Sequence, residues 1–240
     1  ILHGQHLLRN GAEDIWGWNT PAGQERVRAR VRWMVEKSSM TQGVSVLECG
    51  CGTGMFTRRL AETGAKITAI DISKDLLNEA QKKCQASNVI FMQVNLEVPD
   101  GLPEEGFDVI CGVSVLHHID LPKALPALRE KLKPGGCFVF SEPNMMNPLN
   151  KYVIFTDDPE KRKKYGVSPG EQAFYPQELQ QVFEEAGFDV KSLEHRDFMH
   201  PSMPGFLIPA WRGVQYIAEH LPLVRCWSGS LWIYGVKGTS

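Results

Sequence analysis

Three glycines fall within five positions directly behind an apolar run, in the stretch "LECGCGTG" at residues 47–54. Glycine after a buried strand lets the backbone turn tightly and leaves bare main chain for a ligand, while the next helix offers unpaired N–H groups. An acid, Glu48, stands two places before Gly50. The pattern favours a nucleotide-like ligand at this turn, although a tight connection between strand and helix explains the same glycines without one.

Asp71 is the second candidate, because it ends the next apolar run, "KITAID". A carboxylate at the carboxyl edge of the neighbouring strand can accept hydrogen bonds from both hydroxyls of a ribose. Alternatively, Asp71 caps the helix that follows, for which Ser73 is also a cap candidate. Met55 stands where the dinucleotide fingerprint GxGxxG has its third glycine, and this departure argues against a nicotinamide dinucleotide.

Two adjacent histidines, His117 and His118, follow the apolar run "FDVICGV". Imidazole titrates near neutral pH, so either ring can act as a general base. Glu142 ends a later apolar run and is expected at the same edge of a parallel sheet. Each also has a plain structural explanation, the histidines as hydrogen-bonded residues that start a loop and Glu142 as a loop anchor.

These candidates require elements that bring them to one edge. From about residue 44, short β-branched runs alternate with helical segments, and the runs are apolar nearly throughout. Such strands predict a parallel sheet covered by helices on both faces, which is a doubly wound α/β fold. The expected strands cover 44–48, 66–71, 89–94, 107–113 and 137–142, and the expected helices 55–63, 74–86 and 122–132.

The bulk composition fits one globular domain with embellishments: 240 residues, of which 42% are hydrophobic and 22% charged. The net charge of −2 attracts no polyanion, so nucleic acid is not expected as a partner. No apolar stretch approaches the roughly 20 residues that span a bilayer, and stable membrane insertion is not expected. Six cysteines without a CxxC pair favour reduced thiols and a cytoplasmic protein.

Three segments depart from the alternating pattern, and we interpret residues 1–240 as a single domain that carries them. Residues 1–43 contain the helix-like stretch "QERVRARVRWMVEK", which is predicted to pack on the domain. Residues 143–175 and 198–228 carry scattered aromatic side chains and are predicted to form a lid over an apolar acceptor. The same aromatics can fill a core instead, and "MPGFLIPAW" at 203–211 can lie on a membrane surface.

With these motifs in this order, the chain resembles the class I S-adenosylmethionine-dependent methyltransferases, and within them a subgroup that acts on small molecules. The resemblance implies a Rossmann-like, doubly wound sheet of seven strands, mostly parallel with an antiparallel last strand. It covers residues 44–142, through "VLECGCGTG", "ITAIDIS", "MQVNLEVPDGLPEEGFDVICGVSVLHHI" and "LKPGGCFVFSEP".

The resemblance also implies a site for S-adenosyl-L-methionine. The family often has aspartate at Asn95, whose amide can still face an exocyclic amine through its carbonyl oxygen. Arg26 or Arg30 would pair with the methionine carboxylate, unless both lie on a solvated helix face. The other contact residues would be, at the methionine half, Glu48, Gly50, Cys51 and Gly52; at the ribose, Asp71 and Ile72; at the adenine, Asn95 and Leu96; and beside the acceptor, Val113.

Methyl transfer from a sulfonium depends largely on positioning and desolvating the acceptor, and His117 is the favoured base. The stretch "SVLHH" lacks the Asn/Asp-Pro-Pro-aromatic motif that enzymes methylating DNA amino groups carry, and the carboxylate pair of arginine methylators is missing too. Residues 111–113 lack the carboxylates of the metal-dependent catechol group. We therefore expect a metal-free methyltransferase acting on O, N or C of a small, partly apolar metabolite.

Two alternatives remain open at this point. One is a nicotinamide-dependent oxidoreductase, against which Met55 argues, and the other is a catalytically silent nucleotide-binding module. The sequence carries no indication of the oligomeric state.

Overall fold

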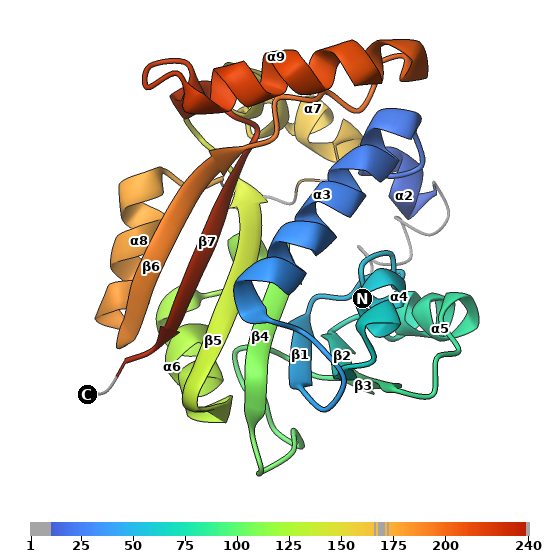
Figure 1. Cartoon of the computed structure of the whole chain (residues 1–240), viewed down its shortest axis with the longest axis vertical. Helices are drawn as coiled ribbons and strands as arrows, with labels where there is room; N and C mark the ends of the chain where they lie inside the picture. The colour runs from blue at the N-terminus through green and yellow to red at the C-terminus, as the bar shows by residue number, and fades with distance from the viewer. Residues whose placement is uncertain (1–10, 166, 168–170, 172, 239–240) are drawn as a thin grey trace.

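A seven-stranded sheet forms the centre of the protein, whose computed structural model describes residues 11–165, 167, 171 and 173–238 (Figure 1). The strand order is β3-β2-β1-β4-β5-β7-β6, and the last strand, β7, runs antiparallel to both of its neighbours. The predicted fold class is confirmed. The strands are β1 Ser45–Cys49, β2 Lys66–Asp71, β3 Val89–Gln93, β4 Phe107–Val113, β5 Leu132–Pro143, β6 Phe188–Arg196 and β7 Ser230–Lys237.

Helices cover both faces of the sheet, as apolar parallel strands require. On one face Met34, Leu60 and Leu77 belong to a core that includes residues of β1 and β2. On the other face Leu125 and Phe183 belong to a second core. The helices of the first face are α3 Pro21–Ser38, α4 Thr57–Leu60 and α5 Lys74–Lys83, and those of the second are α6 Leu121–Lys131 and α8 Pro176–Glu185 (Figure 1).

Two helices are shorter than predicted. The helix expected at 55–63 consists of α4 and a 3₁₀ turn, η1 Ala61–Thr63, which ends at Gly64 in a left-handed conformation. The helix expected at 74–86 ends at Lys83, because Cys84 is extended and the chain returns to the sheet. There the side-chain amide of Asn88 donates to the carbonyl groups of residues 61 and 65, which fixes the start of β3.

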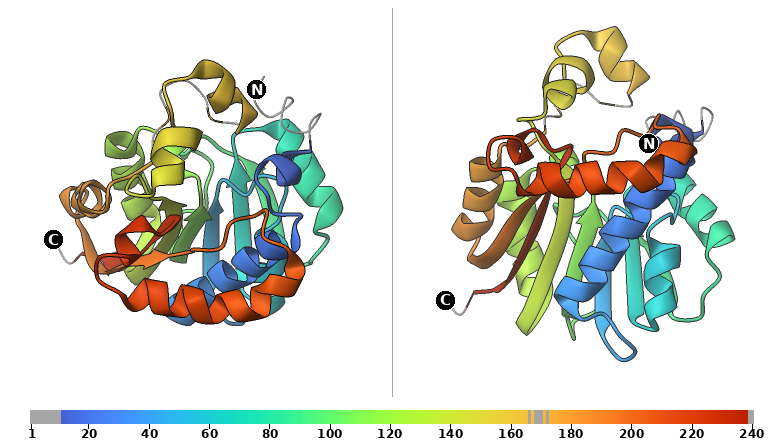
Figure 2. Two further views of the ribbon diagram at one scale, coloured as in Figure 1. Left: turned by 90° about the horizontal axis from the view of Figure 1, so that it is seen from above. Right: turned by 45° about the horizontal axis from the view of Figure 1, so that its top comes forward.

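Parts of the three extra segments, residues 12–15, 159–164 and 208–220, lie at the carboxyl edge of the parallel strands, whereas α3 runs along one face of the sheet (Figure 2). Residues 1–10 of the N-terminal segment, and residues 166, 168–170 and 172, lie outside the described residues. In α3, Val27 and Met34 are buried, as the helical spacing predicts. The extra elements are α2 Ala12–Ile15, a π-helical turn η3 Asn150–Ile154, α7 Pro159–Lys164, η4 Gly205–Leu207, α9 Ile208–His220 and η5 Arg225–Trp227.

The aromatic side chains of these segments divide between packing and exposure. Tyr165 and Tyr175 pack against a small cluster around Phe155, within the segment 143–175. In the C-terminal segment Trp211 packs against Met199, Ala22 and Ile208, whereas Phe206 is 80% exposed and Tyr216 is 64% exposed. No helix within the described ranges is both long and apolar enough to cross a membrane.

Candidate functional site

The glycine turn after β1 is built from three left-handed residues, Gly50, Gly52 and Gly54, with φ of 64°, 55° and 79°. A Cβ at Gly50 would lie 2.4 Å from Val115 Cγ2, and one at Gly54 would lie 3.2 Å from Ala80. Glycine is therefore required at both positions for two reasons: the backbone is left-handed, and Val115 and Ala80 leave no room for a side chain at Gly50 and Gly54. Ligand binding is not needed to explain these two glycines.

The short helix α2 lies over the glycine turn. Glu13 Oε1 accepts hydrogen bonds from Thr53 Oγ1 and from Lys83 Nζ, both at 2.8 Å. Beside them, the ring of Trp16 would lie 3.4 Å from a Cβ at Gly52. Part of the N-terminal segment thus covers the turn where the sequence predicts a ligand.

The carboxylate of Asp71 bridges the end of β2 to the glycine turn. Its Oδ2 accepts from the N–H of Gly52 at 2.9 Å, and its Oδ1 accepts from the N–H of Ser73 at 2.8 Å. Burial raises the pKa of Asp71 above its usual value, although these N–H donors oppose the shift. The N-cap of α5 is Ser73, whose Oγ accepts from Leu76 N. The alternative interpretation of Asp71 as the helix cap is therefore wrong.

The residues predicted at the adenine adjoin Asp71, since β3 pairs with β2. Leu96 is buried, whereas Ile72, which is predicted at the ribose beside Asp71, is 62% exposed, an unusual exposure for a large apolar side chain. Asn95 is exposed, and its Oδ1 accepts from the N–H of Glu97 at 3.0 Å. The side-chain carbonyl of Asn95, which is predicted to face an exocyclic amine, thus accepts a hydrogen bond within its own turn and has one lone pair left for a ligand.

Glu48 is a buried acid at the end of β1, only 3% exposed. Within the described part of the chain its Oε2 has no hydrogen-bond partner, and neither does Oγ1 of Thr57. Burial raises the pKa of Glu48 to about 8, and the charge of Asp71 acts in the same direction. Thr57 opposes this shift through its hydroxyl and N–H, which lie close to the carboxyl group although the hydroxyl is outside hydrogen-bonding geometry. Cys51 is buried close by, in the core on the α3 face. An orphaned buried carboxyl oxygen is costly unless a partner arrives.

His117 and Glu142 form a hydrogen-bonded pair between the loop after β4 and the end of β5. His117 Nδ1 lies 2.8 Å from Glu142 Oε2, and Glu142 is fully buried. Glu142 Oε1 accepts from the N–H groups of Val115 and Leu116, at 2.9 and 3.0 Å. Since these contacts occupy Glu142 as an acceptor, Nδ1 of His117 is the donor, and Nε2 is left to accept a proton. Glu142 is thus a loop anchor that also orients His117.

His118 has a different partner, Glu171, whose Oε1 lies 2.8 Å from its Nδ1. The rings of His117 and His118 lie 4.0 Å apart between centroids. Ligand atoms of His117, His118 and Glu171 all fall within 4.8 Å of one another, so these side chains are potential metal ligands. Sequence reasoning missed this grouping, because Glu171 comes from a loop distant from the histidines in the sequence.

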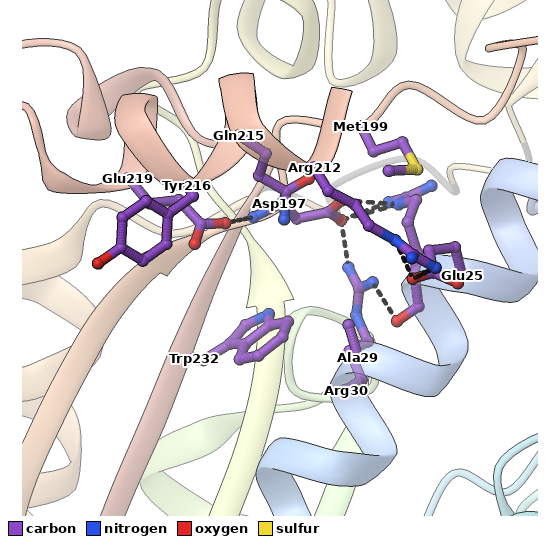
Figure 3. A pocket seen from close by; sticks show the side chains of 11 residues that line it. Glu25, Ala29, Arg30, Asp197, Met199, Arg212, Gln215, Tyr216, Glu219 and Trp232 are labelled. Carbon is purple, nitrogen blue, oxygen red and sulfur yellow. Dashed lines mark hydrogen bonds and ion pairs between the residues drawn. The ribbon is translucent and has the colours of Figure 1, made fainter. Parts of the chain in front are cut away.

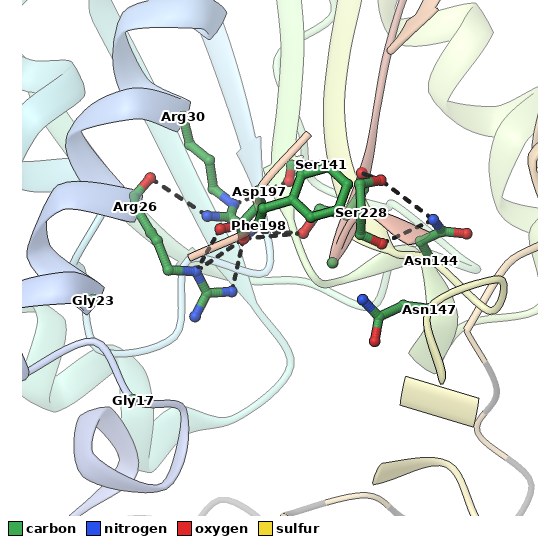
Figure 4. Close-up of polar contacts among 12 residues, drawn as sticks. Gly17, Gly23, Arg26, Arg30, Ser141, Asn144, Asn147, Asp197, Phe198 and Ser228 are labelled. Atoms are coloured by element: carbon green, nitrogen blue, oxygen red, sulfur yellow. Dashed lines mark hydrogen bonds and ion pairs between the residues drawn. The ribbon is translucent and has the colours of Figure 1, made fainter. Parts of the chain in front are cut away.

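Arg26 and Arg30 do not lie on a solvated face, because both bind Asp197 (Figure 4). Asp197 follows β6 and is buried, and its carboxylate lies 2.8 Å from Arg26 Nη2 and 2.6 Å from Arg30 Nη2. Sequence reasoning did not identify Asp197, since no motif surrounds it.

Val113 lies at the end of β4 and packs near Trp18. The guanidinium of Arg26 lies over the ring of Trp18.

A cavity of about 200 Å³ lies between α3, α9 and β7 (Figure 3). Six of its eleven lining side chains are charged. Inside its lining, Trp232 Nε1 and Gln215 Oε1 are buried without hydrogen-bond partners among the described residues. The lining residues are Glu25, Arg26, Ala29, Arg30, Asp197, Met199, Arg212, Gln215, Tyr216, Glu219 and Trp232.

Comparisons with known proteins identify the family to which the chain belongs. A family model described as a methyltransferase domain matches residues 47–140. A ubiquinone biosynthesis O-methyltransferase of Pseudomonas entomophila is 32% identical over 171 residues, which cover 68% of this chain and 72% of that protein. An uncharacterized Synechococcus protein is 47% identical over 107 residues, 40% of this chain but only 25% of that protein.

Among solved structures, the chain resembles the N-methyltransferase NodS of Bradyrhizobium japonicum in complex with S-adenosyl-L-homocysteine. The TM-score is 0.65 at 18% sequence identity, and the match covers 98% of each chain. At this level of identity the likeness concerns the fold.

Proposed function

Because the chain belongs to the class I S-adenosylmethionine-dependent methyltransferases and uses S-adenosylmethionine as its methyl donor, we propose that it methylates a hydroxyl oxygen of a small, partly apolar metabolite. The pair of His117 and Glu142 is the observation that carries this proposal, because a hydroxyl acceptor must lose a proton and Nε2 of His117 can take it. The O-methyltransferase relative supports the choice of oxygen over nitrogen or carbon. The comparisons give no support to a nicotinamide-dependent oxidoreductase.

The residues at the carboxyl edge fit the donor. Asp71 presents a carboxylate to the ribose hydroxyls, and the exposed side chain of Ile72 offers an apolar surface beside it. The orphaned Oε2 of Glu48 can accept from an ammonium group at the methionine end, and Arg26 can bind the carboxylate there. We propose the same site for the remaining residues predicted from the sequence: Gly50, Cys51, Gly52, Asn95, Leu96 and Val113.

The donor supplies an activated methyl group whose leaving sulfur needs no proton. The protein's own part is then to orient the acceptor and to remove its proton. His117 does so through Nε2, while Glu142 holds the ring and stabilises the imidazolium that forms. His118 is proposed to flank the acceptor, and the segments 143–175 and 198–228 are proposed to exclude water from it.

Further properties follow from composition. We propose a metabolite as the partner and no nucleic acid, in keeping with the net charge of −2. All six cysteines are free thiols in the structure, and most are buried, which supports a reducing, cytoplasmic environment. We also propose that residues 1–240 form a single domain in which the segments 143–175 and 198–228 act as a lid.

Asp71 provides the first test of the site. Asp71→Ala is expected to weaken binding of S-adenosylhomocysteine by about 1–3 kcal/mol, because a charged hydrogen-bond acceptor for the ribose is lost. Isothermal titration calorimetry measures this change. Ser73→Ala is the matched control, since it removes the cap of α5 and leaves the carboxylate in place. Equal affinities for wild type and Asp71→Ala would remove Asp71 from the ribose site.

The function itself is tested in two steps. Calorimetry should show binding of S-adenosylhomocysteine and much weaker binding of a nicotinamide dinucleotide. Labelled donor is then incubated with panels of phenols, amines and activated carbon acids that carry apolar substituents. We expect label to enter phenolic hydroxyl groups; transfer to amines alone would overturn the choice of oxygen, and tight nicotinamide binding would overturn the function.

A further inference from the structure

Asp197 stands immediately after β6, and its carboxylate lies between two arginines of α3 (Figure 4). Its side chain is 3% exposed, with Oδ2 2.8 Å from Arg26 Nη2 and 2.6 Å from Arg30 Nη2. Burial alone would raise the pKa of Asp197, but the charges of Arg26 and Arg30 hold it below its usual value. One ionised carboxylate therefore faces two guanidinium groups.

The two arginines differ in how fully they are hydrogen bonded. Arg30 is 2% exposed and also donates to Ser141 Oγ at 3.0 Å, to Ser230 Oγ at 2.8 Å and to the carbonyl of Arg26 at 3.4 Å. Arg26 binds Asp197 through Nε and Nη2, whereas its Nη1 has no partner among the residues that the structure describes. Arg30 thus belongs to the scaffold, and Arg26 keeps donors available.

The available donors of Arg26 suit an anion. A guanidinium held along one edge can offer its remaining N–H groups to a carboxylate without losing further side-chain freedom. Arg26 lies over the ring of Trp18, 5.0 Å from its centroid. Trp18 packs with Met55 and Val113, which belong to the glycine turn and the end of β4. These are the elements to which the methionine half of the donor is assigned.

Asp197 is also fixed by the segment that follows it. Its N–H donates to Glu219 Oε1 of α9 at 3.1 Å, and its carbonyl accepts from Gly229 N, just before β7, at 2.8 Å. Its φ of 78° is left-handed, a conformation that aspartate and asparagine tolerate better than most residues. The position of α9 therefore sets the position of the Asp197 carboxylate, and through it that of Arg26.

We propose that Asp197 is a positioning residue: it holds the guanidinium of Arg26 in place for the carboxylate of the methyl donor and links that contact to α9. The proposal rests on the proposed function, in which Arg26 binds the donor. It requires donor affinity to depend on Asp197, while turnover at saturating donor changes little.

Calorimetry with S-adenosylhomocysteine tests the proposal without knowledge of the acceptor. Asp197→Asn keeps the shape and tolerates the left-handed backbone, and it is expected to raise Kd about tenfold. Arg26→Met is expected to raise Kd by at least as much, and the double variant should bind no more weakly than Arg26→Met. Glu194→Gln is the control, because it removes another ion-paired carboxylate, on β6 itself, that pairs with Lys37 and Arg196.

The outcomes separate this proposal from the proposed function. If Arg26→Met leaves Kd unchanged, Arg26 does not bind the donor. In that case the proposed role of Arg26 in the donor site and the positioning role of Asp197 are both overturned. If Arg26→Met weakens binding while Asp197→Asn only lowers the melting temperature, the positioning role alone is overturned. Should Asp197→Asn not fold, Arg26→Lys carries the test, because it keeps the charge but loses the fork that Asp197 holds. An unchanged Kd for Arg26→Lys would then overturn the positioning role.

Discussion

Replacing His117 with asparagine is expected to lower the rate of methyl transfer at saturating donor by about 100- to 10,000-fold, the range of a lost general base. The affinity for S-adenosylhomocysteine should stay within about twofold of wild type, because His117 Nδ1 is held by Glu142 and its Nε2 serves the acceptor. Initial rates with a phenolic acceptor and labelled donor, together with calorimetry, measure the two quantities.

His118→Asn is the matched control, since the neighbouring ring is 37% exposed and pairs with Glu171 instead of Glu142. At saturating acceptor we expect it to change the rate by less than about threefold, because His118 flanks the acceptor without taking its proton. The assays are repeated with a chelator, because His117, His118 and Glu171 are potential metal ligands. Loss of wild-type activity with the chelator, restored by zinc, would show that His117 is a ligand and not a base.

The sequence predicts the elements of the sheet well because each is marked by local chemistry. The buried strands β1, β2 and β4 read as apolar runs, and the turns beside them carry glycine or a capping serine. The carboxyl ends of these strands then bring Glu48, Asp71 and Val113 to one edge without further information. β6 was not predicted as a separate strand, because its residues alternate with polar ones and it pairs only with β7.

Contacts between distant segments could not be predicted in the same way. Nothing near Asp197 in the sequence indicates that Arg26 and Arg30 bind it, since the arginines lie on α3 and the acid follows β6. The pairing of His117 with Glu142 likewise depends on β4 and β5 being neighbours. Helical spacing correctly indicated an amphipathic α3 but not that its arginines point inward, because periodicity records hydrophobicity and not ion pairing.

Glu48→Gln is expected to remove a large pH dependence of stability. Burial raises the pKa of Glu48 to about 8 in the folded protein, against 4.5 for the ordinary side chain. Between these values the folded chain keeps a proton that the unfolded chain has lost, so the free energy of unfolding falls as pH rises. The whole shift corresponds to as much as about 5 kcal/mol, at 1.36 kcal/mol per pKa unit. Glutamine cannot ionise, so the free energy of unfolding of the variant should not fall in this way. Urea unfolding should show the difference in stability between variant and wild type shifting in favour of the variant by several kcal/mol from pH 5 to 9.

The folded protein without donor favours the protonated form of Glu48, and donor binding should favour the ionised form instead. This change distinguishes a cofactor ligand from an ordinary buried acid. An ammonium group beside the orphaned Oε2 favours the ionised form of Glu48, so binding is expected to release a proton between pH 5 and 8. Calorimetry of S-adenosylhomocysteine in buffers of different ionisation enthalpy detects that proton, and Kd of wild type should fall as pH approaches 8. In Glu48→Gln both effects should vanish. If the variant releases as many protons as wild type, the acid lies outside the donor site, and its burial serves the core alone.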